Sequence, residues 1–312
     1  MSTKGLVPIL PVIAGIMWGS VGVFVRFLSA GGLDSFTIVC TRMIVSAVLL
    51  GAFILITDRA AIKIRLKDIP LLLMGGVLGS SYMNVVYNLA IMNLYLALAS
   101  VLIGLFALWA IFLGRFFFGE KITTRKIVCV VIALAGVVLV SGALETGDIA
   151  SISLFGLAMG ILTGIMYAFN GVATRMLSDR GLKATTINFW FFLFGAISLL
   201  PLCNWGQVGA YVAADPGPAV FWLIGQSICC AIVPYVLFTI ALARMQISLA
   251  STLELAEPAA GMIFGLLLFG EVPTPLMVVG VAMVIFAIAM TFRTPAAKTP
   301  PDDPLPEAAG ES

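Results

Sequence analysis

Ten stretches of apolar sequence, each about 20 residues long, divide this chain of 312 residues. An α-helix needs roughly 20 such residues to cross the hydrocarbon core of a bilayer, and a helix satisfies its own backbone polar groups there. Of all residues 61% are hydrophobic and only 10% are charged. The sequence therefore predicts an all-α polytopic membrane protein with ten transmembrane helices. They cover residues 7–28, 35–57, 69–91, 95–118, 125–143, 153–176, 184–204, 218–242, 248–269 and 274–292.

Several classes of function are excluded by what the sequence lacks. The net charge is only +2, so no basic surface for nucleic acid is expected. There is no histidine and no GxxxxGK[ST] motif, and the five cysteines contain no CxxC pair. We expect no cofactor, no metal site and no catalytic residues. An integral-membrane enzyme is disfavoured because no nucleophile and base can be paired from the sequence.

The lysines and arginines predict how the helices are oriented. If the N-terminus lies inside, fifteen of the seventeen fall on the cytoplasmic side, and only Arg26 and Arg42 do not. Both termini are therefore predicted to be cytoplasmic in a multi-pass protein of the cell inner membrane, with the lipid bilayer as its constant partner. Residues 294–312 are rich in proline and acidic residues, so we expect a disordered cytoplasmic tail.

Two internal matches indicate that the chain contains a repeat. The segment GIMWGSVGVFVR at 15–26 shares six of twelve residues with GIMYAFNGVATR at 164–175, an offset of 149. The segments FGEKIT at 118–123 and FGEVPT at 269–274 match at an offset of 151.

The repeat predicts two five-helix units, residues 1–145 and 150–293. A unit with an odd number of crossings lies upside down relative to its copy, which gives an inverted-topology repeat. This architecture is found mainly in transporters.

Short motifs in both halves resemble a known family. They are WGS at 18–20, TR at 41–42, LAEP at 255–258, and GE followed by Thr after the fourth and ninth spans. In their order and repetition they resemble the EamA branch of the drug/metabolite transporter superfamily, and within it the bacterial aromatic amino-acid exporters. The resemblance implies a ten-helix carrier that exports small metabolites.

Three ionisable residues lie deep within the predicted spans, away from their ends, where charge is costly, so each is a functional candidate. Glu254 and Glu257 share a face of the ninth span, and Pro258 predicts a kink beside them. We expect one Glu to exchange a proton or to meet a substrate ammonium group. The alternative is that both bond neighbouring helices or pair with Arg42. Arg42 itself is a candidate for a substrate carboxylate, or it snorkels to the interface or pairs with Asp34.

Uncharged polar residues follow helical spacing on the third and sixth spans, and rings lie deep in several spans. The repeat offsets extend this pattern to the first and eighth spans. We interpret these residues as the lining of a substrate cavity; hydrogen bonds between helices are the alternative for the polar ones, and core packing for the rings. The predicted substrate-binding residues are Trp18, Ser80, Tyr82, Asn84, Tyr87, Asn88, Trp109, Thr163, Tyr167, Asn170, Tyr235 and Thr239.

Together these patterns predict a secondary transporter that works by alternating access on a small-molecule substrate. Amino acids, aromatic and other neutral ones, are the first hypothesis, with protons as the candidate coupling ion. The alternative is efflux of lipophilic cations or drug-like solutes, which would need the acids and the rings but not Arg42. A scaffold or sensor is a third class of function, and it is disfavoured because it would not need rows of polar residues along the helices of both halves.

Overall fold

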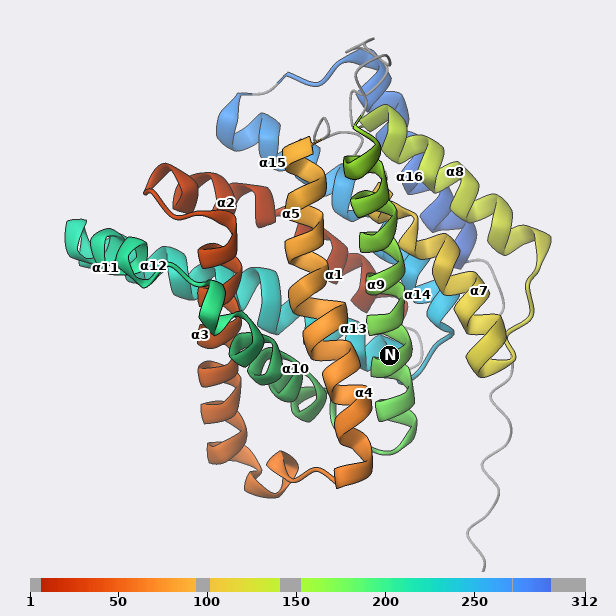
Figure 1. Cartoon of the computed structure of the whole chain (residues 1–312). Helices are drawn as coiled ribbons and strands as arrows, with labels where there is room; N and C mark the ends of the chain where they lie inside the picture. Colours follow the sequence, from red (N-terminus) through yellow and green to blue (C-terminus); the bar gives the residue numbers. More distant parts are fainter. Residues whose placement is uncertain (1–6, 94–101, 141–152, 271, 293–312) are drawn as a thin grey trace, which may run out of the picture.

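A computed structural model describes residues 7–93, 102–140, 153–270 and 272–292 (Figure 1). All regular secondary structure in these ranges is helical. The helices are α1 (Ile9–Gly19), α2 (Val21–Ala30), α3 (Ser35–Thr57), η2 (Arg59–Ile62), η3 (Leu66–Asp68), α4 (Ile69–Leu73), η4 (Met74–Tyr82), α5 (Met83–Asn93), α7 (Phe106–Phe118), α8 (Thr124–Val140), α9 (Leu154–Asp179), α10 (Ala184–Leu199), η6 (Leu200–Leu202), α11 (Trp205–Ala214), α12 (Pro216–Ser227), η7 (Ile228–Ile232), α13 (Val233–Leu242), α14 (Ile247–Glu254), α15 (Glu257–Phe269) and α16 (Pro275–Phe292).

Seven helical segments of the described chain are long and apolar enough to cross a membrane. They are Ile9–Ala30, Ser35–Thr57, Leu66–Tyr87, Leu154–Asp179, Ala184–Leu202, Pro216–Leu242 and Ile247–Phe269. Leu102–Phe118 and Pro275–Ala287 are shorter apolar helices. The predicted all-α, multi-pass class is thus supported, and the ten-helix arrangement in two repeats stays a prediction. The predicted tail at 294–312 lies outside the described residues.

Four predicted spans are not uniform α-helices. The first is interrupted at Ser20, whose hydroxyl donates to the carbonyl of Met17 at 2.6 Å, a local bond that competes with the regular helix. The ninth is interrupted between Glu254 and Glu257, as predicted from Pro258, which has no N–H to bond the carbonyl of Glu254 and whose ring crowds that carbonyl. The third and eighth contain the π-helical segments η4 and η7.

One helix, α11, was not among the predicted elements. It lies between the seventh and eighth predicted spans, and Asn204 caps it by accepting a hydrogen bond from the backbone N–H of Gln207 at 3.2 Å. Trp205 and Tyr211 lie on this helix.

Helices α7 and α15 have the same length and the same kind of C-terminus. Each has 13 residues, and their first and last residues are 151 positions apart. Each ends at a glycine in the left-handed region, Gly119 at φ 65° and Gly270 at φ 66°, a conformation that glycine adopts without steric cost. The positions of α7 and α15 in the chain therefore differ by the same offset as the matching segments FGEKIT and FGEVPT.

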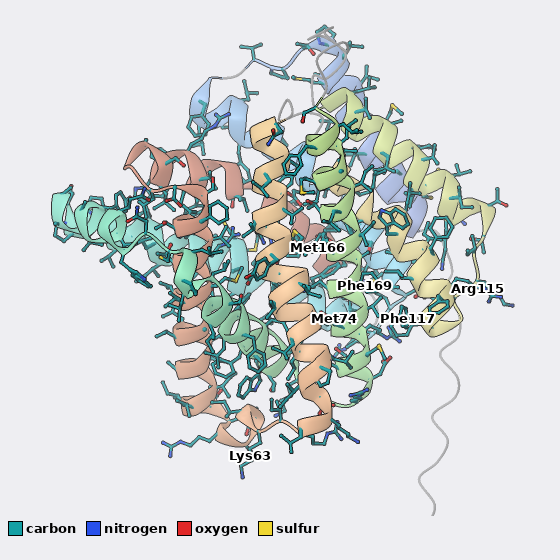
Figure 2. The ribbon with its side chains drawn as sticks, in the orientation of Figure 1. Lys63, Met74, Arg115, Phe117, Met166 and Phe169 are labelled. Carbon is teal, nitrogen blue, oxygen red and sulfur yellow. The ribbon has the colours of Figure 1, made fainter. Side chains whose placement is uncertain are left out.

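Helix α1 is seen behind α5 and α9 in Figure 1 and contacts α13, α14 and α15. Two glycines allow the close approach. A Cβ atom on Gly15 would collide with the carbonyl oxygen of Glu254, and one on Gly19 would lie 2.8 Å from the carbonyl oxygen of Glu257. Gly15 and Gly19 therefore bring α1 directly against the break between α14 and α15. Elsewhere, α9 lies beside η4 and α5, where Figure 2 labels Met74, Met166 and Phe169.

Candidate functional site

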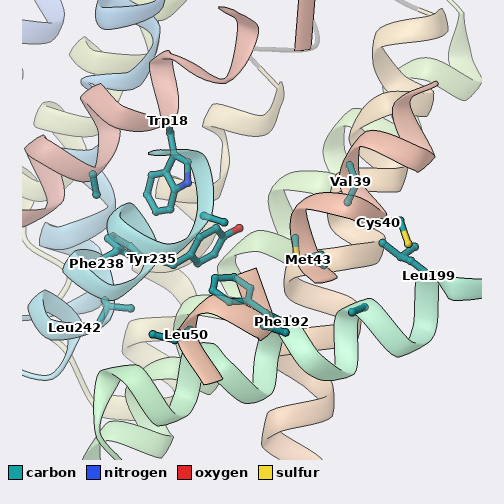
Figure 3. Packing of buried hydrophobic residues seen from close by; sticks show 14 of the residues in the cluster. Trp18, Val39, Cys40, Met43, Leu50, Phe192, Leu199, Tyr235, Phe238 and Leu242 are labelled. Carbon is teal, nitrogen blue, oxygen red and sulfur yellow. The ribbon is translucent and has the colours of Figure 1, made fainter. Parts of the chain in front are cut away.

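A cluster of aromatic rings surrounds Trp18 on the inner face of α1. The centroid of the Trp18 ring lies 5.0 Å from that of Tyr235 and 5.7 Å from that of Phe238 (Figure 3). It lies 6.3 Å from that of Tyr167, and all three pairs have edge-on geometry. Edge-on pairs are a favoured arrangement of buried rings. The indole N–H of Trp18 donates to the carbonyl of Cys230 on η7 at 3.1 Å. We call Trp18, Phe106, Tyr167, Phe192, Tyr235 and Phe238 the ring cluster.

Glu254 lies at the edge of the ring cluster, at the last residue of α14. Its side chain is buried, with 1% of the residue exposed. The hydroxyl of Tyr167 donates a hydrogen bond to Oε1 of Glu254, whereas Oε2 has no partner among the described residues. Glu257 is half-buried and begins α15 on the other side of the break. The break therefore places the two acids at adjoining helix ends.

The start of α14 is fixed by an acid from another part of the chain. Glu120 follows α7 and accepts hydrogen bonds from the backbone N–H of Ile247 at 2.9 Å and from the hydroxyl of Ser248. It also accepts from the ammonium group of Lys126 at 3.2 Å, and both charged side chains are buried. A carboxylate at a helix N-terminus satisfies free N–H groups and interacts favourably with the helix dipole. Glu120 thus fixes where α14 begins, and thereby the position of Glu254 at the end of the same helix.

A second polar group, the amide network, consists of Arg42, Ser80, Asn84 and Asn170. Arg42 donates through Nη2 to Oδ1 of Asn84 at 3.0 Å, and Asn84 donates to the carbonyl of Ser80 at 2.6 Å. Asn170 donates to the hydroxyl of Ser80 at 3.0 Å and to the carbonyl of Gly75 at 2.9 Å. Arg42 is buried, and within the described ranges its Nε atom has no partner. The network joins residues from the second, third and sixth predicted spans.

Tyr235 connects the two groups. It packs on Trp18 and lies next to the side chain of Ser80. The charged groups of Arg42, Glu254 and Glu257 are near enough to interact electrostatically with its hydroxyl. A buried cation, two acids and several ring faces therefore converge on one region. Such a set can hold an ammonium group, a carboxylate and an apolar side chain at once.

The other predicted site residues are less closely connected to this region. Thr239 accepts from Nδ2 of Asn188 at 2.9 Å, and the hydroxyl of Thr163 bonds the carbonyl of Met159 within its own helix. Trp109 packs near Phe112 at 6.4 Å, and its indole N–H has no partner.

Three predicted site residues remain. Tyr82 and Tyr87 are half-buried on η4 and α5. The side chain of Asn88 lies outside the described part of the structure.

Two alternatives considered for Arg42 are not what the structure shows. Asp34 caps α3 by accepting from the backbone N–H of Thr37 at 2.8 Å, so it is engaged away from Arg42. Within the described ranges no ion pair joins Arg42 to Glu254 or Glu257. Arg42 instead bonds an amide.

Sequence reasoning missed two residues of this region. Asn188 on α10 is fully buried, donates to Thr239 and has an Oδ1 atom without a partner. The sequence did contain a signal for it, because Asn188 is an amide inside the predicted span 184–204 and only apolar residues follow it for two helical turns. The role of Glu120 could not have been found in this way, because its partners are 127 and 128 residues away.

Comparisons with known proteins agree on one kind of protein. The model of the EamA-like transporter family matches residues 6–142 and 154–293. An uncharacterized transporter of Archaeoglobus fulgidus is 25% identical over 284 residues, which cover 90% of this chain and 94% of that one. A protein of Streptantibioticus cattleyicolor named as a probable terminal-alkyne amino-acid exporter is 26% identical over 231 residues, 73% of this chain and 75% of that one. A crystal structure with a TM-score of 0.74 covers 91% of this chain and 95% of its own, at 14% identity, and so shares the fold.

Proposed function

Because this chain belongs to the EamA-like transporter family, we propose that it is a secondary transporter that exports amino acids, aromatic and other neutral ones, across the inner membrane by alternating access. The proposal includes the inverted arrangement of residues 1–145 and 150–293, with both termini in the cytoplasm. The relative named as an amino-acid exporter supports this choice of substrate.

The observation that carries the proposal is the unpartnered Oε2 atom of Glu254 beside the ring cluster. A buried polar atom without a partner costs free energy, and a carboxylate inside a membrane costs more. This cost is removed if the carboxyl takes up a proton or if an ammonium group binds it. We propose that Glu254 alternates between these two states, and that Glu257, half-buried across the break, receives the proton on the solvent side.

The substrate carboxylate is assigned to Arg42. Its Nε atom is buried without a partner, while Nη2 is held by Asn84, so the guanidinium group is oriented and still has a donor to offer. The amide network would then position the charged end of the substrate. The ring cluster, which lies on the other side of Tyr235, would accept the apolar side chain.

Efflux of lipophilic cations is the alternative, and the ring cluster favours it. A cation can lie over ring faces and be neutralised by Glu254 without any contact with Arg42. The two functions differ in what they require of Arg42.

Counterflow in liposomes separates the two proposals. Liposomes that contain the full-length protein and an unlabelled amino acid would take up the same labelled compound, in a panel of Trp, Phe, Thr, Met and Lys. We expect protein-dependent accumulation of Trp or Phe, and its loss in both Glu254→Gln and Arg42→Ala. Lys121→Gln, an exposed residue outside this region, is the matched control. No accumulation of any compound by protein shown to be correctly reconstituted would refute amino-acid export. Transport of a lipophilic cation by Arg42→Ala at the wild-type rate would establish the alternative.

A further inference from the structure

A polar crevice opens at one end of the bundle, away from the ring cluster. It has a volume of about 420 Å³ and lies between the α3–α4 connection and the α9–α10 connection. Lys63, labelled at the lower end of the bundle in Figure 2, is part of its wall. The two connections are held together by hydrogen bonds from the Thr186 hydroxyl to the carbonyl of Ala61 at 2.7 Å and from Trp190 to the carbonyl of Ile62 at 3.0 Å.

The charged side chains of the crevice leave a positive excess. The four cations are Lys63, Arg65, Arg180 and Lys183, and the two acids are Asp58 and Asp68, a net charge of +2. Arg65 and Arg180 both bond the fully buried Asp68 at 2.9 Å, and Lys183 bonds Asp58. Lys63 forms no ion pair within the described ranges.

The two arginines are held in place but keep free donors. Arg65 donates through Nη2 to the carbonyl of Arg180, and Arg180 donates through Nη1 to the carbonyl of Lys67 at 3.2 Å. In the described part of the chain Nη1 of Arg65 and both Nε and Nη2 of Arg180 have no acceptor. The side chains of Arg65 and Arg180 are 51% and 35% exposed, so these donors are accessible. Oriented guanidinium groups with free N–H donors fit the oxygens of a phosphate.

The N-terminus of α10 adds to the same site. Lys183 precedes the helix and its side chain does not cap it, and Thr186 in the first turn lines the crevice. The free N–H groups and the dipole of a helix N-terminus attract an anion. Fixed cations, free guanidinium donors and a helix end therefore point into one cavity.

We propose that this crevice binds the phosphate group of an anionic membrane lipid. Two large apolar side chains next to it in the chain, Ile56 and Leu66, are each 85% exposed, as expected where acyl chains lie beside a headgroup. The positive-inside pattern of the sequence predicts that this end lies in the cytoplasmic leaflet, where basic pockets between helices bind anionic headgroups. The proposal does not depend on which substrate the protein transports.

Native mass spectrometry of the full-length protein in detergent tests it. The protein is titrated with phosphatidylglycerol and, separately, with phosphatidylcholine of the same acyl chains, and the bound lipid is counted. We expect a preference for phosphatidylglycerol that falls about tenfold or more in Lys63→Gln/Lys183→Gln, since each cation near a membrane surface contributes about fivefold to affinity. Lys63→Gln alone breaks no ion pair and should give about half of this loss on a logarithmic scale, while Lys63→Arg should bind as the wild type does.

The control removes the same charge elsewhere. Arg115→Gln/Lys121→Gln takes two exposed cations from the last turn of α7 and from the connection that follows it, and should leave the preference unchanged. An equal loss in this control would mean that only the total charge matters, and the site would be refuted. A second arm adds inorganic phosphate or glycerol phosphate in large excess. If either displaces the lipid completely, the ligand is a soluble phosphate and the lipid assignment is wrong.

Discussion

Replacing Glu120 by alanine should destabilise the protein more than replacing any exposed acid. The carboxylate serves three donors, which are the backbone N–H of Ile247, the hydroxyl of Ser248 and the ammonium group of Lys126. Both charged side chains are less than 9% exposed, so the ammonium group left behind would be buried without a partner. Loss of one partner from a buried pair costs about 3–5 kcal/mol, and an unsatisfied N–H adds about 1–3 kcal/mol. We expect a loss of at least about 4 kcal/mol in the free energy of unfolding.

A double-mutant cycle built on the single variants Glu120→Met and Lys126→Met shows whether the buried charge is the cause. Glu120→Met/Lys126→Met removes both charges and keeps apolar volume, so the double variant should lose only about 1–3 kcal/mol, from the uncapped start of α14. Unfolding is followed by titration with sodium dodecyl sulfate in detergent micelles, with helicity measured by circular dichroism. The coupling free energy should be at least about 2 kcal/mol.

The control for this cycle is Asp179→Ala. Asp179 pairs with Arg175 at 3.1 Å, but the two side chains are 48% and 27% exposed, so the loss should stay below about 1 kcal/mol. A double variant no more stable than Glu120→Ala would refute the reasoning, because the unpaired Lys126 would then not be the source of the cost.

Three further predictions concern packing, hydrogen bonding and pH. Gly15→Ala should lower the free energy of unfolding by about 1–3 kcal/mol, because its Cβ would collide with the end of α14. Gly22→Ala, which has open space around it, should leave the free energy of unfolding unchanged. The same titration measures both variants, and equal stabilities would disprove the contact. Trp18→Phe keeps the ring packing but leaves the carbonyl on η7 without its donor, so we expect a loss of about 1–3 kcal/mol, and no loss would show that the bond does not form. The hydrogen bond from Lys183 holds the pKa of Asp58 below its usual value, so its contribution to stability is complete at neutral pH and is lost as the pH falls through the carboxyl range. In Asp58→Asn the difference in stability between neutral and acidic pH should be smaller; an unchanged difference would contradict the bond.

The sequence predicted the helical class because the length of an apolar stretch is a local property. The sequence also singled out Trp18, Tyr167 and Glu254 as candidates for the substrate site, because polar and ionisable groups inside a membrane are costly unless they face a cavity or another helix. The contacts among them depend on how helices meet, and no local pattern contains that. The pairing of Arg42 is an example: Asp34 is nearer in sequence, but it is used as a helix cap, so Arg42 bonds Asn84 instead.

The interruptions of the helices were predicted less well. A proline is a visible signal, and Pro258 correctly predicted the interruption of the ninth span, which lies at residues 255–256. The break at Ser20 and the π-helical turns arise from packing and from side-chain bonds to the backbone, which leave no distinct residue pattern. The α11 helix was missed because its 10 residues are too few to form an apolar stretch that could cross a bilayer.

Helix α14 has only eight residues, and at a rise of about 1.5 Å per residue it is about 12 Å long. Glu120 holds one end and Tyr167 holds the other. A helix this short behaves as a rigid rod, so a tilt of its axis displaces both of its ends, the one bonded to Glu120 and the one bonded to Tyr167. The joint at residues 255–256 is where such a tilt is taken up. Glu254 and Glu257, on its two sides, would then change their separation with every swing of the rod.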